Sequence, residues 1–260
     1  MDETERNQYL LWAKLDRFSR KIEQAERNIA KGFDYMEKPY ISMSFGKDSL
    51  VMADIILNRY PSTPVMYVNC GKYDEWPDTV RVKEAFLERH AGIEFIELEG
   101  SSIWEYYQKV GLYIQDEETT REARIAQREY AESLGKVLDR EAKKRGFDGT
   151  FIGMRSDESY IRSRLFAMRG EIYFASVREQ WVCCPLARWS GKDIWAYIVS
   201  TNLPYNELYD MAPEGRELAR NGAMFGTRSM RYGRLVFLKR MYPDLFNEFA
   251  AEFPEVRAYI

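Results

Sequence analysis

Apolar residues recur at alternating steps of four and three along the first thirty positions of the chain. The positions that share this spacing are Leu11, Leu15, Phe18, Ile22, Ala25 and Ile29. This period matches one face of an α-helix, so residues 1–33 are predicted to form an N-terminal helix that ends at Gly32. Its apolar face packs either on its own domain or against a second subunit, and the latter would make the protein a homodimer.

Short apolar runs rich in β-branched and aromatic residues alternate with helical patterns through the next part of the chain. The expected strands lie at 40–44, 65–69, 93–98 and 150–153, and the expected helices at 48–59, 78–90 and 134–145. This alternation is typical of right-handed βαβ crossovers, so it predicts an α/β fold: a Rossmann-like parallel sheet with helices on both faces. Ligands of such sheets bind beyond the carboxyl ends of the strands.

Three further divisions of the chain follow from the pattern. The charged, helix-prone stretch 101–132 is predicted to be an insertion, and two helices are expected after Pro185, at 192–199 and 233–242. We therefore expect a nucleotide-binding domain over 34–210 and a basic, mainly helical C-terminal region over 211–260.

Composition narrows the class of protein. The chain has 260 residues, 45% of them hydrophobic, which is enough for one sizeable core. It has no apolar run of about 18 residues and no basic-then-apolar leader, so we expect no membrane span and no export signal. Three cysteines without CxxC spacing predict neither a disulfide framework nor a metal cluster, and they favour a reducing cytoplasm.

The clearest candidate for chemistry is the turn that follows the first expected strand. Residues 41–52 read ISMSFGKDSLVM, a strand that turns through Gly46 and opens a helix. Backbone N–H groups at a helix N-terminus attract anions, Ser44 and Ser49 add hydroxyl donors, and Lys47 adds a positive charge. The alternative is a polar turn that only caps the helix, with Asp48 or Ser49 as the N-cap residue. The GxxxxGK[ST] spacing of a Walker A loop is missing.

Four ordered motifs carry a resemblance to a known family. Ser44–Ser49 (SFGKDS) resembles the SGGKDS signature of PP-loop ATP pyrophosphatases, with Phe45 in place of the first glycine. The other three motifs resemble the phosphoadenosine phosphosulfate (PAPS) reductase branch, in its GxRxxES, PLxxWTxxDVW and LPYN elements. They are residues 153–159 (GMRSDES) followed by Arg162, residues 185–195 (PLARWSGKDIW), and residues 203–206 (LPYN).

The resemblance implies an adenine nucleotide alpha hydrolase fold and cleavage of ATP to AMP and pyrophosphate, with Mg²⁺ bound to the phosphates. On this reading the candidate catalytic residues are Lys47, Asp48, Arg155 and Cys70. The candidate nucleotide-binding residues are Ser42, Ser44, Phe45, Gly46, Lys47, Asp48, Ser49, Asn69, Gly153, Arg155, Glu158 and Arg162.

Two departures from the family pattern change the expected reaction. The final residues 253–260 (FPEVRAYI) lack the ECGxH-like catalytic cysteine of the reductases, so reduction of PAPS is not expected. Residues 69–79 (NCGKYDEWPDT) replace the family's DTGxxFPET segment, and the neutral Asn69 stands where the family often has an acid.

The charged residues after the fourth expected strand have two readings. Arg155, Arg162 and Arg164 would face the rim of the loop and bind phosphate, or they would form ion pairs with Asp157 and Glu158. The two acids, in turn, would either hold Mg²⁺ or leave it to water and substrate phosphates.

The cysteines also divide into candidates and alternatives. Cys70 follows a strand end near the expected α-phosphate, so it could carry sulfur as a thiolate, or it could be a small packed residue. Cys183 and Cys184 are neighbours in sequence, and at most one of them would address the site.

The charge of the chain is unevenly distributed. The net charge is −3, yet residues 216–240 contain seven basic residues and one acid. This segment favours a polyanion, either a nucleotide tail or a DNA or RNA backbone, over a merely solvated face. The candidate DNA contacts are Arg216, Arg220, Arg228, Arg231 and Arg234.

These features together predict an enzyme that uses ATP to adenylate an acceptor oxygen, so that sulfur can then displace AMP. In type, the chain resembles the ATP pyrophosphatase of bacterial DNA phosphorothioation systems, and this resemblance implies a cysteine desulfurase as sulfur donor and a DNA phosphate as acceptor. The alternatives are sulfonucleotide metabolism, as in PAPS reductase or ATP sulfurylase, and a nucleotide sensor without turnover.

Overall fold

The chain consists of two compact units. The computed structural model describes residues 1–71, 75–102, 105, 108, 136–212, 214–219 and 228–259. The first unit comprises Met1–Tyr67, Asp78–Leu98 and Asp139–Asn221, and the second comprises Val68–Pro77, Glu99–Leu138 and Gly222–Ile260. The first thirty-three residues therefore belong to the same unit as the sheet, and most of the expected insertion at 101–132 lies outside the described residues.

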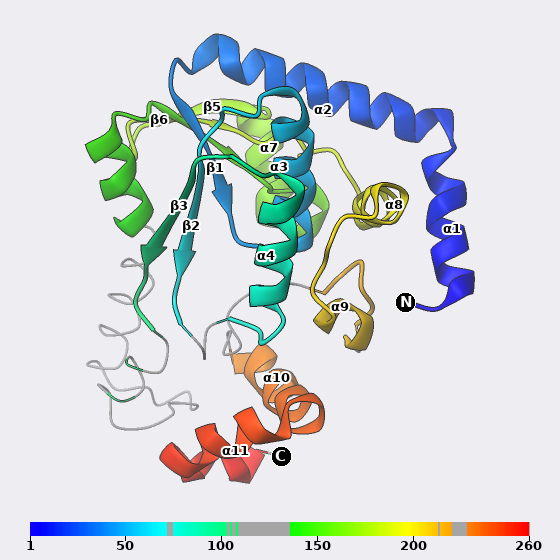
Figure 1. Ribbon diagram of the computed structural model, residues 1–260, viewed down its shortest axis with the longest axis vertical. Helices are drawn as coiled ribbons and strands as arrows, with labels where there is room; N and C mark the ends of the chain where they lie inside the picture. Colours follow the sequence, from blue (N-terminus) through cyan, green and yellow to red (C-terminus); the bar gives the residue numbers. More distant parts are fainter. Residues whose placement is uncertain are drawn as a thin grey trace. The chain divides into compact units, whose positions relative to one another are not determined.

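A six-stranded sheet organises the fold, in the order β3-β2-β1-β4-β6-β5 (Figure 1). The strands are β1 (Pro39–Met43), β2 (Val65–Asn69), β3 (Phe95–Glu99), β4 (Gly149–Ile152), β5 (Ile172–Ala175) and β6 (Gln180–Cys183). β1 pairs in parallel with both β2 and β4, and β4 pairs in parallel with β6. The mostly parallel, Rossmann-like sheet predicted from the sequence is confirmed.

The antiparallel edge of the sheet was not predicted. β5 and β6 form a hairpin in which Ile172 lies opposite Cys183 and Ala175 opposite Gln180. Each strand has only four residues, and the charged turn between them includes Glu179 at φ 54°. Such short runs interrupted by polar residues give too weak an alternation to mark a strand.

Helices cover both faces of the sheet. Figure 1 shows α3 and α4 on one side and the helix at residues 136–145 on the other. The helices of the first unit are α1 (Glu3–Ala13), α2 (Asp16–Tyr35), α3 (Lys47–Arg59), α4 (Thr79–Arg89), α7 (Tyr160–Arg169), α8 (Gly191–Thr201) and α9 (Leu208–Met211). In the second unit, α10 (Arg228–Met241) packs against α11 (Pro243–Glu252), which a 3₁₀ turn over Pro254–Tyr259 follows. None of the described helices combines the length and apolarity that crossing a membrane requires.

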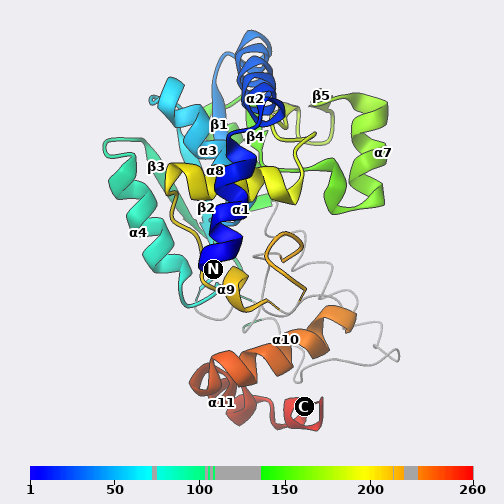
Figure 2. The ribbon, with the colours of Figure 1, turned by 90° about the vertical axis from the view of Figure 1, so that its right-hand side faces the viewer.

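The N-terminal region differs from the single helix that the spacing predicted. The helix is interrupted at Lys14 and Leu15. α1 packs on α8 (Figure 2), and α2 packs on α3 and β6. Gly32 does not end the helix but lies inside α2, where an added Cβ would come within 2.8 Å of the Phe151 ring. The glycine is therefore needed for close packing of α2 on β4, and the N-terminal helices pack on their own domain.

Helix α3 is buried almost all round, and one carboxylate in its middle ties three helices together. Asp54 is fully buried and accepts hydrogen bonds from Arg89 Nε, His90 Nε2 and Tyr197 Oη, each at 2.8 Å. Burial acts to raise the pKa of Asp54, but the hydrogen bonds from His90 and Tyr197 and the charge of Arg89 outweigh it and lower that pKa.

Replacing Asp54 by Asn should lower the free energy of unfolding by about 3 kcal/mol at pH 7, because it leaves Arg89 without its buried anion. Since the folded-state pKa of Asp54 is lowered, its contribution is present above its unfolded value of about 3.9 and is lost as pH falls further. Urea unfolding between pH 3 and 7 should thus show the wild type losing stability at acid pH faster than Asp54→Asn. Asp34→Asn, at an exposed position, is the control, and parallel pH curves for wild type and Asp54→Asn would contradict this.

Candidate active site

Two of the four motifs meet at the centre of the sheet. β1 and β4 are neighbours, with Ser42 in register with Ile152, and the strand order runs in opposite directions from this pair. The SFGKDS loop follows β1, and the GMRSDES segment follows β4. Ligands of open α/β sheets bind at such a switch point, beyond the carboxyl ends of the strands.

The loop closes on itself through its two serines. Ser44 Oγ lies 3.1 Å from Ser49 Oγ, and the Ser44 backbone N–H also donates to Ser49 Oγ at 3.3 Å. Ser49 Oγ in turn donates to the Gly46 carbonyl. The N-cap residue of α3 is Gly46, without a side-chain cap, so the alternative reading with Asp48 or Ser49 as N-cap residue is wrong.

Phe45 holds a backbone conformation that usually needs glycine. Its φ is 51°, in the left-handed region, at the position where the family signature has its first glycine. The ring is fully buried and packs edge-on against Tyr67 and Phe86, at centroid distances of 4.9 and 6.2 Å. The aromatic packing offsets the backbone strain, so Phe45 shapes the loop from behind.

Lys47 is the buried cation of the loop. It is 1% exposed, and its Nζ donates to the Ala219 carbonyl at 2.6 Å. Its backbone N–H donates to the Tyr209 hydroxyl at 3.0 Å, and Asp48 Oδ2 lies 3.4 Å from Nζ. Burial, together with the charge of Arg155, lowers the pKa of Lys47 against the opposing effect of Asp48.

A second buried cation joins the two motif segments. Arg155 is 2% exposed, and its guanidinium donates to Asp48 at 2.6 Å and to Asp157 at 2.5 Å. Burial acts to lower the pKa of Arg155, but the two carboxylates raise it. Of the two readings of the sequence, the structure shows the ion pairs, and Asp157 also accepts from the Gly191 backbone N–H.

The rest of the β4 segment supports this arrangement. A Cβ on Gly153 would lie 2.9 Å from backbone atoms of Asp48 and Ser49, so only glycine permits the two loops to touch. Glu158 accepts from the Arg155 backbone N–H and pairs with Arg162. Arg164 instead lies over the exposed ring of Tyr160 on α7.

The described residues offer little to a metal ion. Within the described ranges, no three His, Cys, Asp or Glu side chains gather as metal ligands. Asp48 and Asp157 pair with Arg155, and Glu158 pairs with Arg162. The donor set therefore fits a Mg²⁺ ion that the phosphates and water hold, and not one that a protein cage holds.

The thiols differ in their surroundings. Cys70 and Asn69 lie at the end of β2 in the second unit, where the Asn69 side chain accepts from the Gly71 N–H and Cys70 is half-buried. Burial raises the pKa of Cys184 to about 12 and raises that of Cys183 as well. Both of these thiols are thus protonated at neutral pH.

The basic segment corrects one of the predicted DNA contacts. Arg216 is only 7% exposed, because its guanidinium pairs with Glu5 through two bonds of 2.7 Å and also with Asp210. Arg216 therefore forms internal ion pairs, and its guanidinium is not available to a polyanion. Arg228, Arg231 and Arg234 lie on α10, and Arg220 falls outside the described residues.

The two downstream motifs have structural explanations. Ser190 caps α8, accepting from the Asp193 N–H, while Asp193 accepts from the Ser190 N–H and from Trp12 Nε1. Asn206 of the LPYN segment bonds Thr79 at the start of α4.

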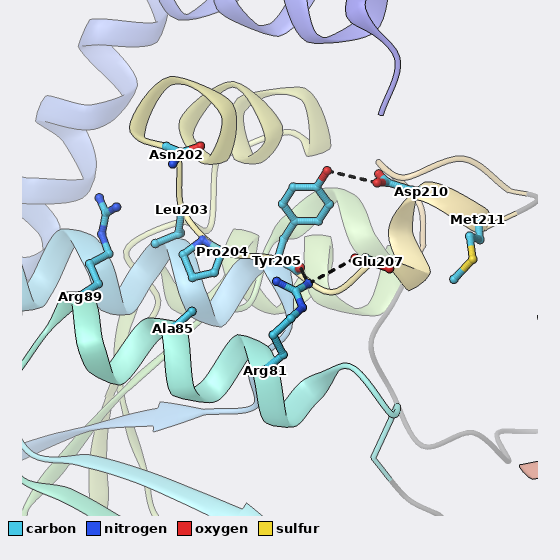
Figure 3. A pocket seen from close by; sticks show the side chains of 10 residues that line it. All are labelled: Arg81, Ala85, Arg89, Asn202, Leu203, Pro204, Tyr205, Glu207, Asp210 and Met211. Atoms are coloured by element: carbon cyan, nitrogen blue, oxygen red, sulfur yellow. Dashed lines mark hydrogen bonds and ion pairs between the residues drawn. The ribbon is translucent and has the colours of Figure 1, made fainter. Parts of the chain in front are cut away.

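A pocket of about 560 Å³ lies between α4 and the LPYN segment. Figure 3 shows Arg81 and Arg89 on its α4 side and Tyr205 and Asp210 on the other. Arg81 is held by Asp78 and Arg89 by Asp54, so both cations already have carboxylate partners.

Two groups at the loop escaped the sequence analysis. The Tyr209 hydroxyl and the Ala219 carbonyl are the partners of Lys47, and they come from residues more than 160 positions away. Tyr209 follows the LPYN motif by three residues, a signal that could have suggested it, whereas no side-chain pattern can mark a backbone carbonyl.

Comparison with solved structures supports the fold. The crystal structure of a PAPS reductase from Candida auris, in a phosphate complex, aligns with a TM-score of 0.53 over 81% of this chain and 92% of that one. The sequence identity is 17%, so this similarity shows the fold alone.

Comparison with protein sequences shows the family. An uncharacterized protein of Methanocaldococcus jannaschii is 28% identical over 87% of this chain, and this chain spans about half the length of that protein and of a second archaeal relative. The adenosine 5'-phosphosulfate reductase of a Geobacillus species is 25% identical, over 68% of this chain and 69% of its own length. A family model described as the phosphoadenosine phosphosulfate reductase domain matches residues 38–242. The chain therefore belongs to the phosphoadenosine phosphosulfate reductase domain family.

Proposed function

We propose that the protein is an ATP pyrophosphatase that adenylates an acceptor for sulfur incorporation. The observation that carries the proposal is the meeting of the SFGKDS and GMRSDES segments at the β1–β4 switch point. An acceptor oxygen attacks the α-phosphorus. The bond between the α-phosphorus and the oxygen that bridges it to the β-phosphorus breaks, and pyrophosphate leaves with that oxygen and the electron pair. The terminal sulfur of a persulfide then attacks the adenylated acceptor and displaces AMP, and a thiol reductant cleaves the S–S bond so that one sulfur stays on the acceptor.

The residues at the switch point would share the work of holding the phosphates. Lys47 supplies an ammonium and a backbone N–H, and Ser44 and Ser49 supply hydroxyls beside them. Arg155 acts as a positioning residue, because it fixes Asp48 and thereby the start of α3. Mg²⁺, held by the phosphates, would neutralise charge on the leaving pyrophosphate.

The sulfur chemistry is assigned by elimination among the thiols. Cys183 and Cys184 have raised pKa values and are fully buried, so neither would be an effective nucleophile. Cys70 is half-buried and is the remaining candidate for a sulfur carrier. A cysteine desulfurase is the proposed donor, and a DNA backbone phosphate is the proposed acceptor.

The reductase names of the relatives motivate a second candidate, activity on a sulfonucleotide. The protonated state of the two buried thiols argues against their use in a reductive step. Assays with adenosine phosphosulfate in place of ATP separate the two candidates.

Lys47→Met and Ser49→Ala should each lower the rate of pyrophosphate release from ATP by about a hundredfold, as expected for loss of a preorganised phosphate donor. Methionine keeps the apolar stem of Lys47, since the residue is buried and alanine would leave a cavity. Lys31→Ala, at an exposed lysine of α2, is the matched control. Wild-type turnover by both variants would refute the phosphate loop, and ATP binding without pyrophosphate release in the wild type would indicate a sensor.

Cys70→Ser should abolish sulfur incorporation into DNA and leave pyrophosphate release unchanged, because a carrier thiol acts after adenylation. The two products are measured in one reaction that contains the desulfurase, by pyrophosphate assay and by mass spectrometry of the digested DNA. Full sulfur incorporation by Cys70→Ser would show that the persulfide of the partner delivers sulfur directly, and loss of both activities would indicate a structural defect.

Replacing Arg228, Arg231 and Arg234 of α10 by Ala should weaken DNA binding and reduce the slope of log K against log salt by about three. ATP affinity should not change, and binding titrations at several salt concentrations measure both. Arg216 is left unchanged because it forms an internal ion pair with Glu5. Absence of DNA binding by the wild-type protein would contradict a DNA acceptor and would indicate a small-molecule acceptor instead.

A further inference from the structure

The segment that covers Lys47 is itself held by the N-terminal helix. Residues 214–219, here called the strap, follow α9 and place the Ala219 carbonyl on Lys47 Nζ. α9 contributes the Tyr209 hydroxyl to the Lys47 backbone N–H, and its ring lies 5.2 Å from Nζ. Two protein oxygens thus accept from the backbone N–H and from the ammonium of Lys47, the two Lys47 donors that the proposed function assigns to phosphate.

Access to Lys47 is closed by this arrangement. The residue is 1% exposed, so no phosphate oxygen can reach Nζ while the strap is in place. The backbone N–H has a single proton, which Tyr209 already accepts. Phosphate therefore competes with the strap for the ammonium of Lys47 and with α9 for its backbone N–H.

Helix α1 fastens the strap from the outside. Glu5 binds Arg216 through two parallel bonds of 2.7 Å, and Tyr9 Oη donates to Glu217 at 3.1 Å. The same helix is anchored on α8 through Trp12 and Asp193 (Figure 2).

Helix α8 also contacts the strap. Trp195 Nε1 donates to the Arg216 carbonyl at 3.0 Å, and an added Cβ on Gly191 would come within 2.9 Å of Glu217. The strap thus packs on the start of α8 and is bonded to side chains of α1. Both helices belong to the same compact unit as the loop.

We propose that the strap is an inhibitory segment, that it must leave Lys47 before nucleotide phosphate binds, and that its contacts with α1 set how often it opens. The proposal rests on the proposed function of the same loop. When the competent state is a minor population, the apparent dissociation constant for ATP is the intrinsic one divided by that population. Loosening the α1 contacts should consequently tighten ATP binding, whereas loosening a segment that completes the site would weaken it.

The test compares Glu5→Gln with Glu3→Gln in the full chain. Both residues are acidic and lie in the first turn of α1, so the two changes alter the helix charge alike, but only Glu5 contacts the strap. Opening is measured without nucleotide, as the rate at which a short pulse of acetylating reagent modifies Lys47, read by mass spectrometry. Binding is measured as the dissociation constant for ATP by calorimetry.

In Glu5→Gln, the reagent should acetylate Lys47 about tenfold faster than in Glu3→Gln, and ATP should bind about tenfold more tightly. Loss of one charge-assisted ion pair should shift the opening equilibrium by about that factor. Tyr9→Phe, which removes one hydrogen bond and no charge, should change both quantities in the same direction by a smaller factor. Thermal unfolding confirms that each variant is folded.

Two results would overturn the proposal that the strap is inhibitory. Equal Lys47 acetylation in Glu5→Gln and Glu3→Gln would show that α1 does not hold it, and faster acetylation with weaker ATP binding would show that it completes the site. Faster acetylation in a protein that binds no ATP in any form would instead refute the proposed function, and with it the competition for phosphate.

Discussion

The buried ion pair between Arg155 and Asp48 is the interaction on which the site depends. A guanidinium that is 2% exposed persists only with anionic partners, because desolvating an unpaired cation is prohibitive. Arg155 comes after β4 and Asp48 opens α3 after β1, so satisfying this one charge brings two distant loops together. Gly153 permits the contact, since its missing side chain leaves room for the backbone of Asp48 and Ser49.

The sheet and its central loop could be predicted because their signals are local. The strands at 40–44, 65–69 and 150–153 agree with β1, β2 and β4 to within about a residue, since each is a buried run flanked by turn residues. The β5–β6 hairpin and the break at Lys14 were not predicted. In the first case four-residue strands give no clear period, and in the second the spacing of apolar residues continues through the break.

Which charged side chains of the site are buried could not be predicted from the sequence. Lys47, Arg155 and Arg216 look alike in a sequence, as basic residues near polar turns, and each was assigned to phosphate or DNA. In the structure all three are less than 8% exposed, and each has an internal acceptor. Their partners lie far away in sequence, at Ala219, at Asp48 and at Glu5, so only tertiary structure reveals whether a cation is free. Phe45 shows the same limit, because its left-handed backbone depends on the aromatic cluster beneath it.

This internal compensation bears on how a polyanion could bind at all. Around the loop, Lys47 lies beside Asp48, Arg155 between Asp48 and Asp157, and Arg162 beside Glu158. A triphosphate that approaches these pairs meets three carboxylates along with the cations, so side-chain charge alone gives little net attraction. If the proposed function holds, the remaining attraction would come from backbone N–H groups at the start of α3 and from a divalent cation that travels with the phosphates. A site of this kind would bind the magnesium complex of a nucleotide far better than the free nucleotide, and titrations of ATP with and without Mg²⁺ would show whether it does.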